Sequence, residues 1–91
     1  MSAWQVFYEG RVQGVGFRYS IRQIAHGFDV TGWVRNQPDG RVELQTTGSD
    51  DEVSAFLEAI RQSELHAHVK GEHRTALSTP PVARGFEIRH E

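Results

Sequence analysis

Three glycines lie within the seven residues from 10 to 16, between two segments that have different hydrophobic periods. Residues 4–9, before them, are dominated by aromatic and β-branched side chains, as a strand would be. From Phe17 the apolar residues instead recur at the spacing of one helical stripe, and Gly27 supplies a stop. The sequence therefore predicts a strand that passes into a helix through a short glycine-rich loop.

The middle of the chain predicts a hairpin followed by a second helix. Residues 30–35 have the pattern of a strand, and residues 37–40 form a tight turn into a third strand. Ser49 and Glu52 then have the spacing of a capping box, and the helix that they begin should end near residues 62–63. The apolar residues at helical spacing in it are Val53, Phe56, Leu57 and Ile60.

The last third of the chain has a weaker pattern. Residues 66–73 are compatible with a fourth strand around Val69, which Gly71 would interrupt. Residues 85–89 alternate again and predict a short last strand. The path of the chain from about 63 to 82 stays open.

The resulting order is βαββαβ with one extra terminal strand. It predicts an α+β fold of the ferredoxin-like, split-βαβ type, a sandwich with two helices on one face of an antiparallel sheet. Ninety-one residues fill one core rather than two, so we expect a single domain over residues 1–91. Phe17 and Trp33 are expected to be core residues.

The composition narrows the function classes. The chain has no cysteine, which excludes disulfides, a thiolate nucleophile and cysteine-ligated zinc. No segment has the pattern of a signal peptide or a membrane span, so we expect a cytoplasmic protein, by default a monomer. Ten Lys and Arg against twelve Asp and Glu give a net charge of −2, with the basic residues scattered. Nucleic-acid binding is therefore not indicated.

The glycine-rich loop has the properties of an anion site. Glycine adopts positive φ at little cost, so successive N–H groups can form an anion-binding concavity. A helix that begins near Phe17 adds its unsatisfied N–H groups and the positive end of its dipole. Arg18 follows at once, and a cation in a first helical turn opposes the dipole. This mismatch favours an anionic ligand.

Two separate motifs resemble the signature motifs of the acylphosphatase family, in their usual order and separation. The first is the run of residues 10–18. The second comprises residues 32–36, followed by 39–42 and Gly48. The resemblance covers about residues 8–60 and agrees with the predicted order of elements.

The resemblance implies hydrolysis of a carboxyl phosphate to carboxylate and inorganic phosphate, without metal or cofactor. The phosphate would sit against the N–H groups of the loop, with the guanidinium of Arg18 gripping two of its oxygens. Asn36 would hold the attacking water, since its amide both donates and accepts hydrogen bonds. A phosphate oxygen of the substrate would take the proton, because neither motif contains a conventional base. The loop residues implicated are Gln13, Gly14, Val15, Gly16, Phe17 and Arg18.

Two other function classes stay open. The chain could be a binding module that kept the phosphate cradle without useful turnover, since related acylphosphatase-like domains form part of the large hydrogenase-maturation carbamoyltransferases. A small nucleic-acid binder of ferredoxin-like fold is the third interpretation, but the strands lack the paired aromatic motif and basic surface that it needs. The acyl group is open as well, because acetyl phosphate, carbamoyl phosphate and 1,3-bisphosphoglycerate all satisfy the motifs.

Other polar side chains have structural interpretations. Three arginines are expected to be solvated charges rather than ligands: Arg11, Arg22 and Arg35. The first and third of them could add positive potential around the site. Three histidines lie within eight residues of the C-terminal third: His66, His68 and His73. The first two would share one face of a strand, but no carboxylate or cysteine completes a metal set, so we expect no metal.

Two features depart from the acylphosphatase pattern. Tyr8 stands where the family usually has an aliphatic residue. Ser63-Glu64-Leu65 replaces the Gly-Pro that commonly follows the second helix. Both departures lie away from the proposed cradle, so they bear on strand four and on stability rather than on the chemistry.

Overall fold

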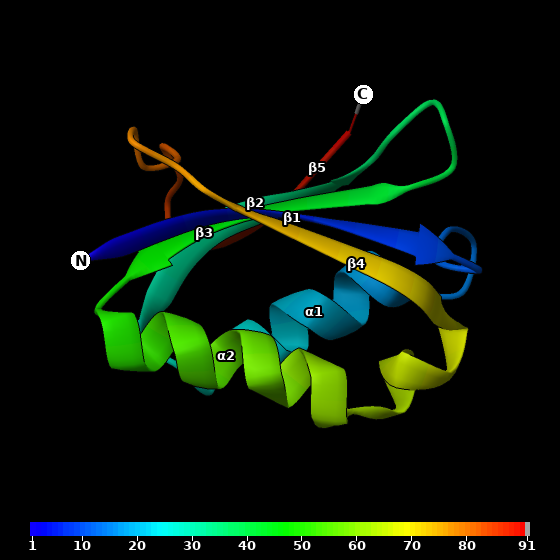
Figure 1. Ribbon diagram of the computed structural model, residues 1–91, viewed down its shortest axis with the longest axis horizontal. Helices are drawn as coiled ribbons and strands as arrows, with labels where there is room; N and C mark the ends of the chain where they lie inside the picture. The colour runs from blue at the N-terminus through cyan, green and yellow to red at the C-terminus, as the bar shows by residue number, and fades with distance from the viewer. Residues whose placement is uncertain (91) are drawn as a thin grey trace.

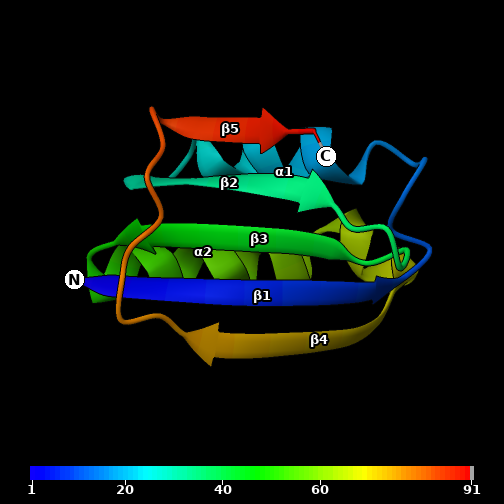
Figure 2. The ribbon, with the colours of Figure 1, turned by 90° about the horizontal axis from the view of Figure 1, so that it is seen from above.

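The computed structural model describes residues 1–90, in which five strands, two α-helices and one short 3₁₀ helix form two layers (Figure 1). Their bounds are β1 (Ser2–Gly10), α1 (Phe17–Ala25), β2 (Val30–Asn36), β3 (Val42–Gly48), α2 (Asp50–Gln62), η1 (Glu64–His68), β4 (Val69–Ala76) and β5 (Phe86–Arg89). The sheet has the order β4-β1-β3-β2-β5, and both α-helices cover the same face of it (Figure 2). The α+β sandwich and the order of elements expected from the sequence are confirmed.

Strand β5 makes the sheet mixed. Strands β1 to β4 pair antiparallel, as expected, whereas β5 pairs in parallel with β2. The chain leaves β4 at one edge of the sheet and crosses to the opposite edge through residues 77–85. There the N–H of Gly32 donates to the carbonyl of Gly85 (3.0 Å), where the parallel pairing begins. This crossover places β5 beside α1, where β5 contributes to the site described below.

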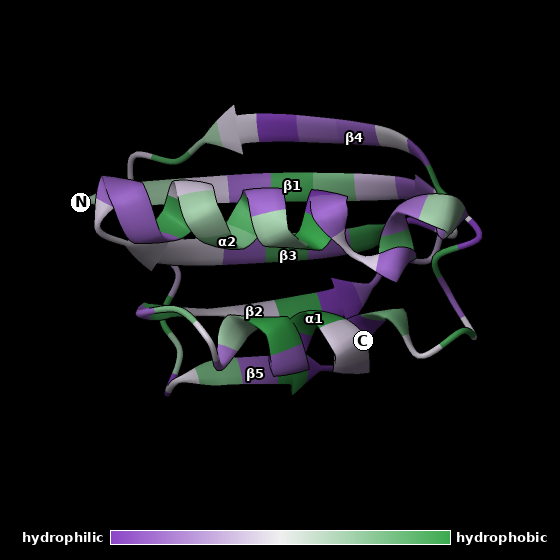
Figure 3. Ribbon diagram, turned by 90° about the horizontal axis from the view of Figure 1, so that it is seen from below, coloured by the Kyte–Doolittle hydropathy of each residue, from purple (hydrophilic) through white to green (hydrophobic). Residues whose placement is uncertain are grey.

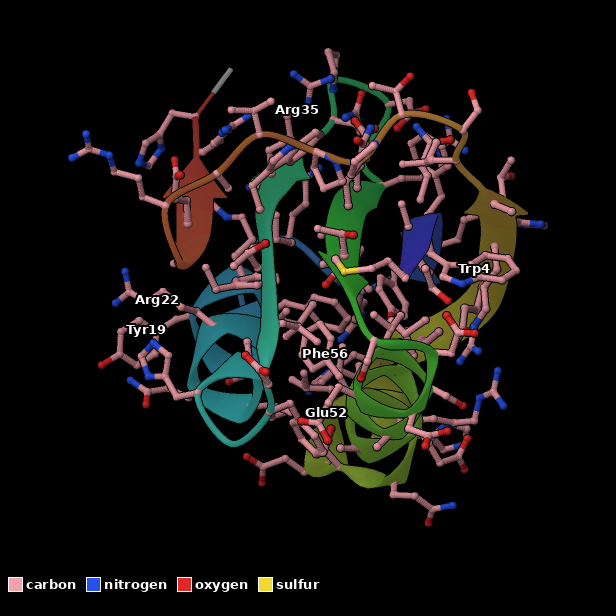
Figure 4. All side chains as sticks on the ribbon, turned by 90° about the vertical axis from the view of Figure 1, so that its left-hand side faces the viewer. Trp4, Tyr19, Arg22, Arg35, Glu52 and Phe56 are labelled. Carbon is pink, nitrogen blue, oxygen red and sulfur yellow. The ribbon has the colours of Figure 1, made fainter. Side chains whose placement is uncertain are left out.

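The core lies between the helices and the sheet, with Phe56 of α2 inside it (Figure 4). The ring of Phe56 makes an edge contact with Phe86, at 5.5 Å between centroids, and a tilted contact with Phe28, at 6.0 Å. Phe17 is buried at the start of α1, as expected, and its ring meets that of Tyr8 at 5.4 Å. Because Phe17 is anchored in the core, the first turn of α1 has a fixed position.

Trp33 is buried, but it does not belong to this core. Side chains alternate along β2, and Val34 points into the core, so Trp33 faces the side of the sheet without helices. Its ring is covered by two guanidinium groups, those of Arg35 (4.9 Å to the centroid) and Arg89 (5.1 Å). Figure 4 shows Arg35 on this open face, across the sheet from Phe56. The expectation of a core tryptophan is therefore right about its burial, but Trp33 lies outside the core between the helices and the sheet, with two guanidinium groups over its ring.

Helix α2 begins where the capping pattern predicts. Ser49 Oγ accepts the N–H of Glu52 at 3.3 Å. The Glu52 carboxylate, which would reach back to Ser49 in a full capping box, accepts the N–H of Asp29 at 2.6 Å. Glu52 therefore ties the start of α2 to the loop that leads into β2. The helix ends at Gln62, in agreement with the sequence prediction.

The segment after α2 differs from the sequence expectation. Ser63 Oγ accepts the N–H of Leu65 at 3.2 Å and caps η1, while the Leu65 side chain is buried. His66 and His68 therefore lie on a 3₁₀ helix and not on one face of a strand, which is a correction. Strand β4 begins only at Val69 and runs to Ala76 without a break at Gly71.

Tyr8 has a buried hydroxyl group that the described residues around it do not satisfy. It is 1 % exposed, and its hydroxyl has no hydrogen-bond partner among residues 1–90. It pairs across β1 and β4 with Glu72, on a strand that is largely hydrophilic (Figure 3). Burial, reinforced by the negative charge of Glu72, raises the pKa of the Tyr8 phenol above its ordinary value.

Replacing Tyr8 with phenylalanine is expected to raise the free energy of unfolding by about 1 kcal/mol, because a buried unpaired hydroxyl costs about that much. The same variant should lose the wild type's fall in stability above pH ~10, where the unfolded phenol ionises and the buried one keeps its proton. Urea denaturation at pH 7 and at pH 10.5 to 11 measures both effects. A less stable Phe variant at pH 7 would mean that the hydroxyl has a favourable partner.

Candidate functional site

The glycine-rich loop, residues 11–16, has the backbone geometry of an anion-binding nest. Gly14 and Gly16 have φ of 79° and 74°, and no other residue type in the described chain has positive φ. The sign of φ therefore alternates from residue 13 to residue 16. Alternation between left-handed and ordinary conformations turns successive N–H groups toward one concave side, which favours an anion there.

The N–H groups from residue 13 to residue 18 have no acceptor within the described residues. The first amide bond of the helix is Ser20 N–H to Gly16 O, at 3.0 Å. Gly16 is the N-cap of α1 and has no side chain to cap it. A folded protein normally pairs such groups, so the loop and the helix start together offer a row of donors to a ligand.

The charges at the two helix starts differ in sign. The first turn of α2 carries three acidic residues, Asp50, Asp51 and Glu52, which complement its positive dipole end. The first turn of α1 carries no acidic residue, and it contains Arg18 instead. An anion bound at α1 would supply the missing negative charge.

Arg18 is half-buried and only partly engaged. One of its terminal nitrogens donates to the carbonyl oxygen of Arg89 in β5 at 3.3 Å. No carboxylate of residues 1–90 lies within ion-pair distance of it. A guanidinium has five N–H donors, so most of those of Arg18 are available to an anion. The contact with β5 holds the side chain in place.

Asn36 is the last residue of β2 and approaches the loop from the sheet. It has the same strand parity as Val34, so it points to the helix side, opposite to Arg35. Its Oδ1 atom is buried and has no hydrogen-bond partner among residues 1–90. A buried amide oxygen without a partner is costly, and a bound water would satisfy it.

These elements enclose a pocket of about 150 Å³. It is lined by Val12, Gly14, Gly16, Phe17, Arg18, Tyr19, Asn36 and Ile88. The structure thus brings together five of the residues expected from the sequence, while Gln13 and Val15 are not among those that line the pocket. The glycine loop and the β2–β3 hairpin lie at the same end of the molecule in both ribbon views (Figures 1 and 2).

Three lining residues were missed by the sequence reasoning. Val12 lies inside the first motif and Tyr19 directly follows it, so their place in the sequence was an available signal. Ile88 has no such signal, because it reaches the pocket only through the parallel pairing of β5 with β2.

The other arginines take no part in the pocket. Arg11 is exposed, as expected. Arg22 is half-buried and stacks on the Tyr19 ring at 5.3 Å, pointing outward from α1 (Figure 4). Arg35 is not a free charge, since it pairs with the buried carboxylate of Glu43 at 3.0 Å on the open face. That ion pair removes Arg35 as a source of positive potential at the site.

The histidines do not gather into a metal site. His73, on β4, has its Nε2 atom 3.5 Å from the carboxylate of Glu9. Within residues 1–90 no three His, Cys, Asp or Glu side chains are arranged to hold a metal ion. In the same range, no helix has the length and apolar character needed to cross a bilayer.

Replacing Gly16 with alanine is expected to weaken phosphate binding by about tenfold, because the left-handed conformation costs a residue with Cβ about 1–2 kcal/mol. An added Cβ would meet no atom within 4 Å, so the effect would be conformational and not steric. Gly27→Ala is the matched control, since Gly27 has no positive φ and its Cβ would make only an ordinary contact, 3.5 Å from Ile24 O. The inhibition constant of phosphate measures the difference, and equal constants for the two variants would contradict the nest.

Comparison with known proteins shows the family and the fold. The acylphosphatase family profile matches residues 4–88. An acylphosphatase of Geobacillus thermodenitrificans is 38 % identical over 90 residues, covering 99 % of this chain and 96 % of its own. The crystal structure of the Bacillus subtilis acylphosphatase superposes with a TM-score of 0.86 at 32 % identity, over 98 % of this chain and 99 % of that one.

A larger protein contains the same fold. The HypF structure from T. kodakarensis matches all of this chain with a TM-score of 0.83 and 26 % identity, but the match covers only 12 % of that protein. The family profile and the full-length relative, together with the glycine loop, Arg18 and Asn36 around one pocket, decide the assignment. This chain belongs to the acylphosphatase family.

Proposed function

We propose that the chain hydrolyses carboxyl phosphates to carboxylate and inorganic phosphate at the pocket between the glycine loop and Asn36. Membership of the acylphosphatase family supports the reaction. The observation that carries the residue roles is the joint lining of one small pocket by Gly14, Gly16, Arg18 and Asn36. These residues come from two motifs that are separate in the sequence.

In this proposal the phosphoryl group sits in the loop. The free N–H groups of residues 13–18 donate to its oxygens, and Arg18 binds two of them through its planar guanidinium. Donors aimed at the phosphoryl oxygens stabilise the charge that spreads over them in the transition state. The contact between Arg18 and the Arg89 carbonyl orients the guanidinium before substrate arrives.

The attacking water is held by the Asn36 amide. The oxygen of this water attacks phosphorus, in line with the acyl oxygen of the leaving group. The bond between phosphorus and the acyl oxygen breaks, and the carboxylate leaves. The proton of the water passes to a phosphate oxygen. The carboxylate is a good leaving group, so the protein needs no general acid, and positioning with electrostatic stabilisation suffices.

Initial-rate assays with acetyl phosphate, carbamoyl phosphate and a hydrophobic acyl phosphate test the proposal. We expect hydrolysis well above the uncatalysed rate, with inorganic phosphate as a competitive inhibitor. A non-competitive pattern would place the phosphate site elsewhere. The panel also ranks the acyl groups, which the pocket residues do not discriminate.

A binding module without useful turnover is the second candidate, and the match to a small part of HypF favours it. It would bind phosphate, as measured by calorimetry, and leave every acyl phosphate of the panel intact. Turnover that depends on Arg18 would reject it.

We further propose that the protein acts as a cytoplasmic monomer on small molecules and binds neither nucleic acid nor membranes. The net charge of −2 and the absence of cysteine support this view. Light scattering after size-exclusion chromatography should give the monomer mass of 10.3 kDa. A larger mass in dilute solution would show that the protein is an oligomer and not a monomer.

A further inference from the structure

We propose that the side chain of Gln13 is a positioning residue that sets the distance between the phosphate loop and Asn36. This inference rests on the proposed function, because it assigns to Gln13 the task of bringing the water toward the phosphoryl group. It concerns the side-chain amide, and not the backbone N–H that the loop motif implies.

The Gln13 amide uses both of its N–H donors on the β2–β3 hairpin. Nε2 donates to the carbonyl of Gln37 at 2.8 Å and to the carbonyl of Arg41 at 2.9 Å. The Gln37 N–H itself donates to the Arg41 carbonyl at 2.8 Å, so these residues form the neck of the hairpin. The Gln13 side chain therefore binds the base of the hairpin at both of its strands.

The two ends of this bridge adjoin the two halves of the pocket. Gln13 directly precedes Gly14, and Gln37 directly follows Asn36. Within residues 1–90, the two Gln13 bonds are the only hydrogen bonds between the segments 11–18 and 36–41. The Gln13 amide therefore makes the direct hydrogen-bond link between the loop and the hairpin, in addition to the core packing of Val12 and Phe17.

The hairpin side of the bridge is rigid. Glu43 is 4 % exposed, and its carboxylate accepts from Gln37 Nε2 at 2.6 Å and from Arg35 Nε at 3.1 Å. These two donors flank Asn36 on either side in the sequence. Glu43 holds the residues before and after Asn36 in place. A change at Gln13 is therefore expected to move the loop relative to Asn36, and not to move Asn36 itself.

Glutamate at position 13 is the sharpest change. It keeps the size of glutamine, but an ionised carboxylate has no donor and would face two carbonyl oxygens. A displacement of about 1 Å between reacting groups can cost about 100-fold in rate, so even partial loosening should be measurable. Phosphate binding by the loop and Arg18 should change less in the neutral Gln13→Met, because it does not depend on the hairpin, whereas the Gln13→Glu carboxylate beside the loop would also repel phosphate.

The test is a double-mutant cycle with Gln13→Glu, Asn36→Ala and the double variant, assayed on acetyl phosphate. We expect Gln13→Glu to lower kcat by about tenfold or more alone, and by less than about twofold when Asn36 is already alanine. Gln62→Glu is the matched control, because Gln62 is exposed on α2 and, within residues 1–90, its side chain bonds only to Glu58. It should keep the wild-type kcat.

Several results would overturn the inference. A wild-type kcat in Gln13→Glu would do so, and so would effects that multiply in the double variant, because Gln13 would then act independently of Asn36. Gln13→Met, which is neutral and lacks donors, replaces Gln13→Glu in the cycle if thermal denaturation shows that the latter is unfolded. An Asn36→Ala variant with wild-type turnover would instead refute the water role in the proposed function, and the inference would fall with it.

Discussion

Replacing Arg18 with alanine is expected to abolish measurable phosphate binding and to lower kcat/KM by at least about 1000-fold, because loss of one preorganised donor at a developing charge already costs 100- to 1000-fold. Arg18 supplies a full positive charge and paired donors in a pocket where no carboxylate of residues 1–90 neutralises it. Calorimetric titration with phosphate and steady-state hydrolysis of acetyl phosphate measure the two effects.

Two matched variants separate the role of this guanidinium from general charge. Arg18→Lys keeps the charge but not the planar pair of donors, so we expect it to recover only part of the activity. Arg22→Ala removes a positive charge one turn further along the same helix, on a side chain that does not itself line the pocket but stacks on Tyr19, which does. It should retain wild-type phosphate binding. Equal losses in the Arg18 and Arg22 alanine variants would show that only the overall potential matters.

Replacing Asn36 with alanine should lower kcat by about 100- to 1000-fold and leave the inhibition constant of phosphate within about threefold of the wild type. We expect this difference because the loop and Arg18 hold the phosphoryl group, whereas the Asn36 amide holds the water. The unpartnered, buried Oδ1 of Asn36 is the acceptor that this water would satisfy. Rate and inhibition measurements on the same preparation provide the comparison.

The control for Asn36 lies on the same strand. Thr31 is exposed near the other end of β2, so Thr31→Ala tests whether any loss on this strand affects turnover. We expect wild-type kcat from it. If Asn36→Ala weakened phosphate binding as strongly as turnover, Asn36 would be a phosphate ligand, and its assignment as the residue that holds only the water would be wrong.

The sequence was informative where local patterns determine the structure. The periods before and after the glycine loop placed β1 and α1, and the Ser49 cap placed α2. It was less informative where tertiary pairing decides. The parallel position of β5 depends on a crossover to the far edge of the sheet, and η1 depends on a Ser63 cap with Leu65 buried beneath it.

The same distinction holds for the site. Gly14, Gly16 and Arg18 are neighbours in the sequence, and the family resemblance added Asn36, so the lining of the pocket could be expected in outline. The contact of Arg18 with the Arg89 carbonyl and the two bonds of Gln13 join residues that are 71, 24 and 28 positions apart. No local pattern encodes such contacts.

Trp33 illustrates a further limit. A tryptophan in a strand is usually a core residue, and the burial of Trp33 was expected correctly. Nothing in the sequence indicated its face, on which the guanidinium groups of Arg35 and Arg89 lie over the ring. Which face of β2 points to the helices was decided by Val34 and the core around it.

Hydrolysis of acetyl phosphate in water labelled with oxygen-18 tests the central claim most directly, because the label records which atom the water attacks. If the pocket holds the phosphoryl group and the Asn36 amide directs the water at phosphorus, the wild-type protein will accelerate the reaction and place one labelled oxygen in phosphate and none in acetate. Label in acetate would mean that the water attacks the acyl carbon. Either this label or the absence of any acceleration by the protein would contradict the account.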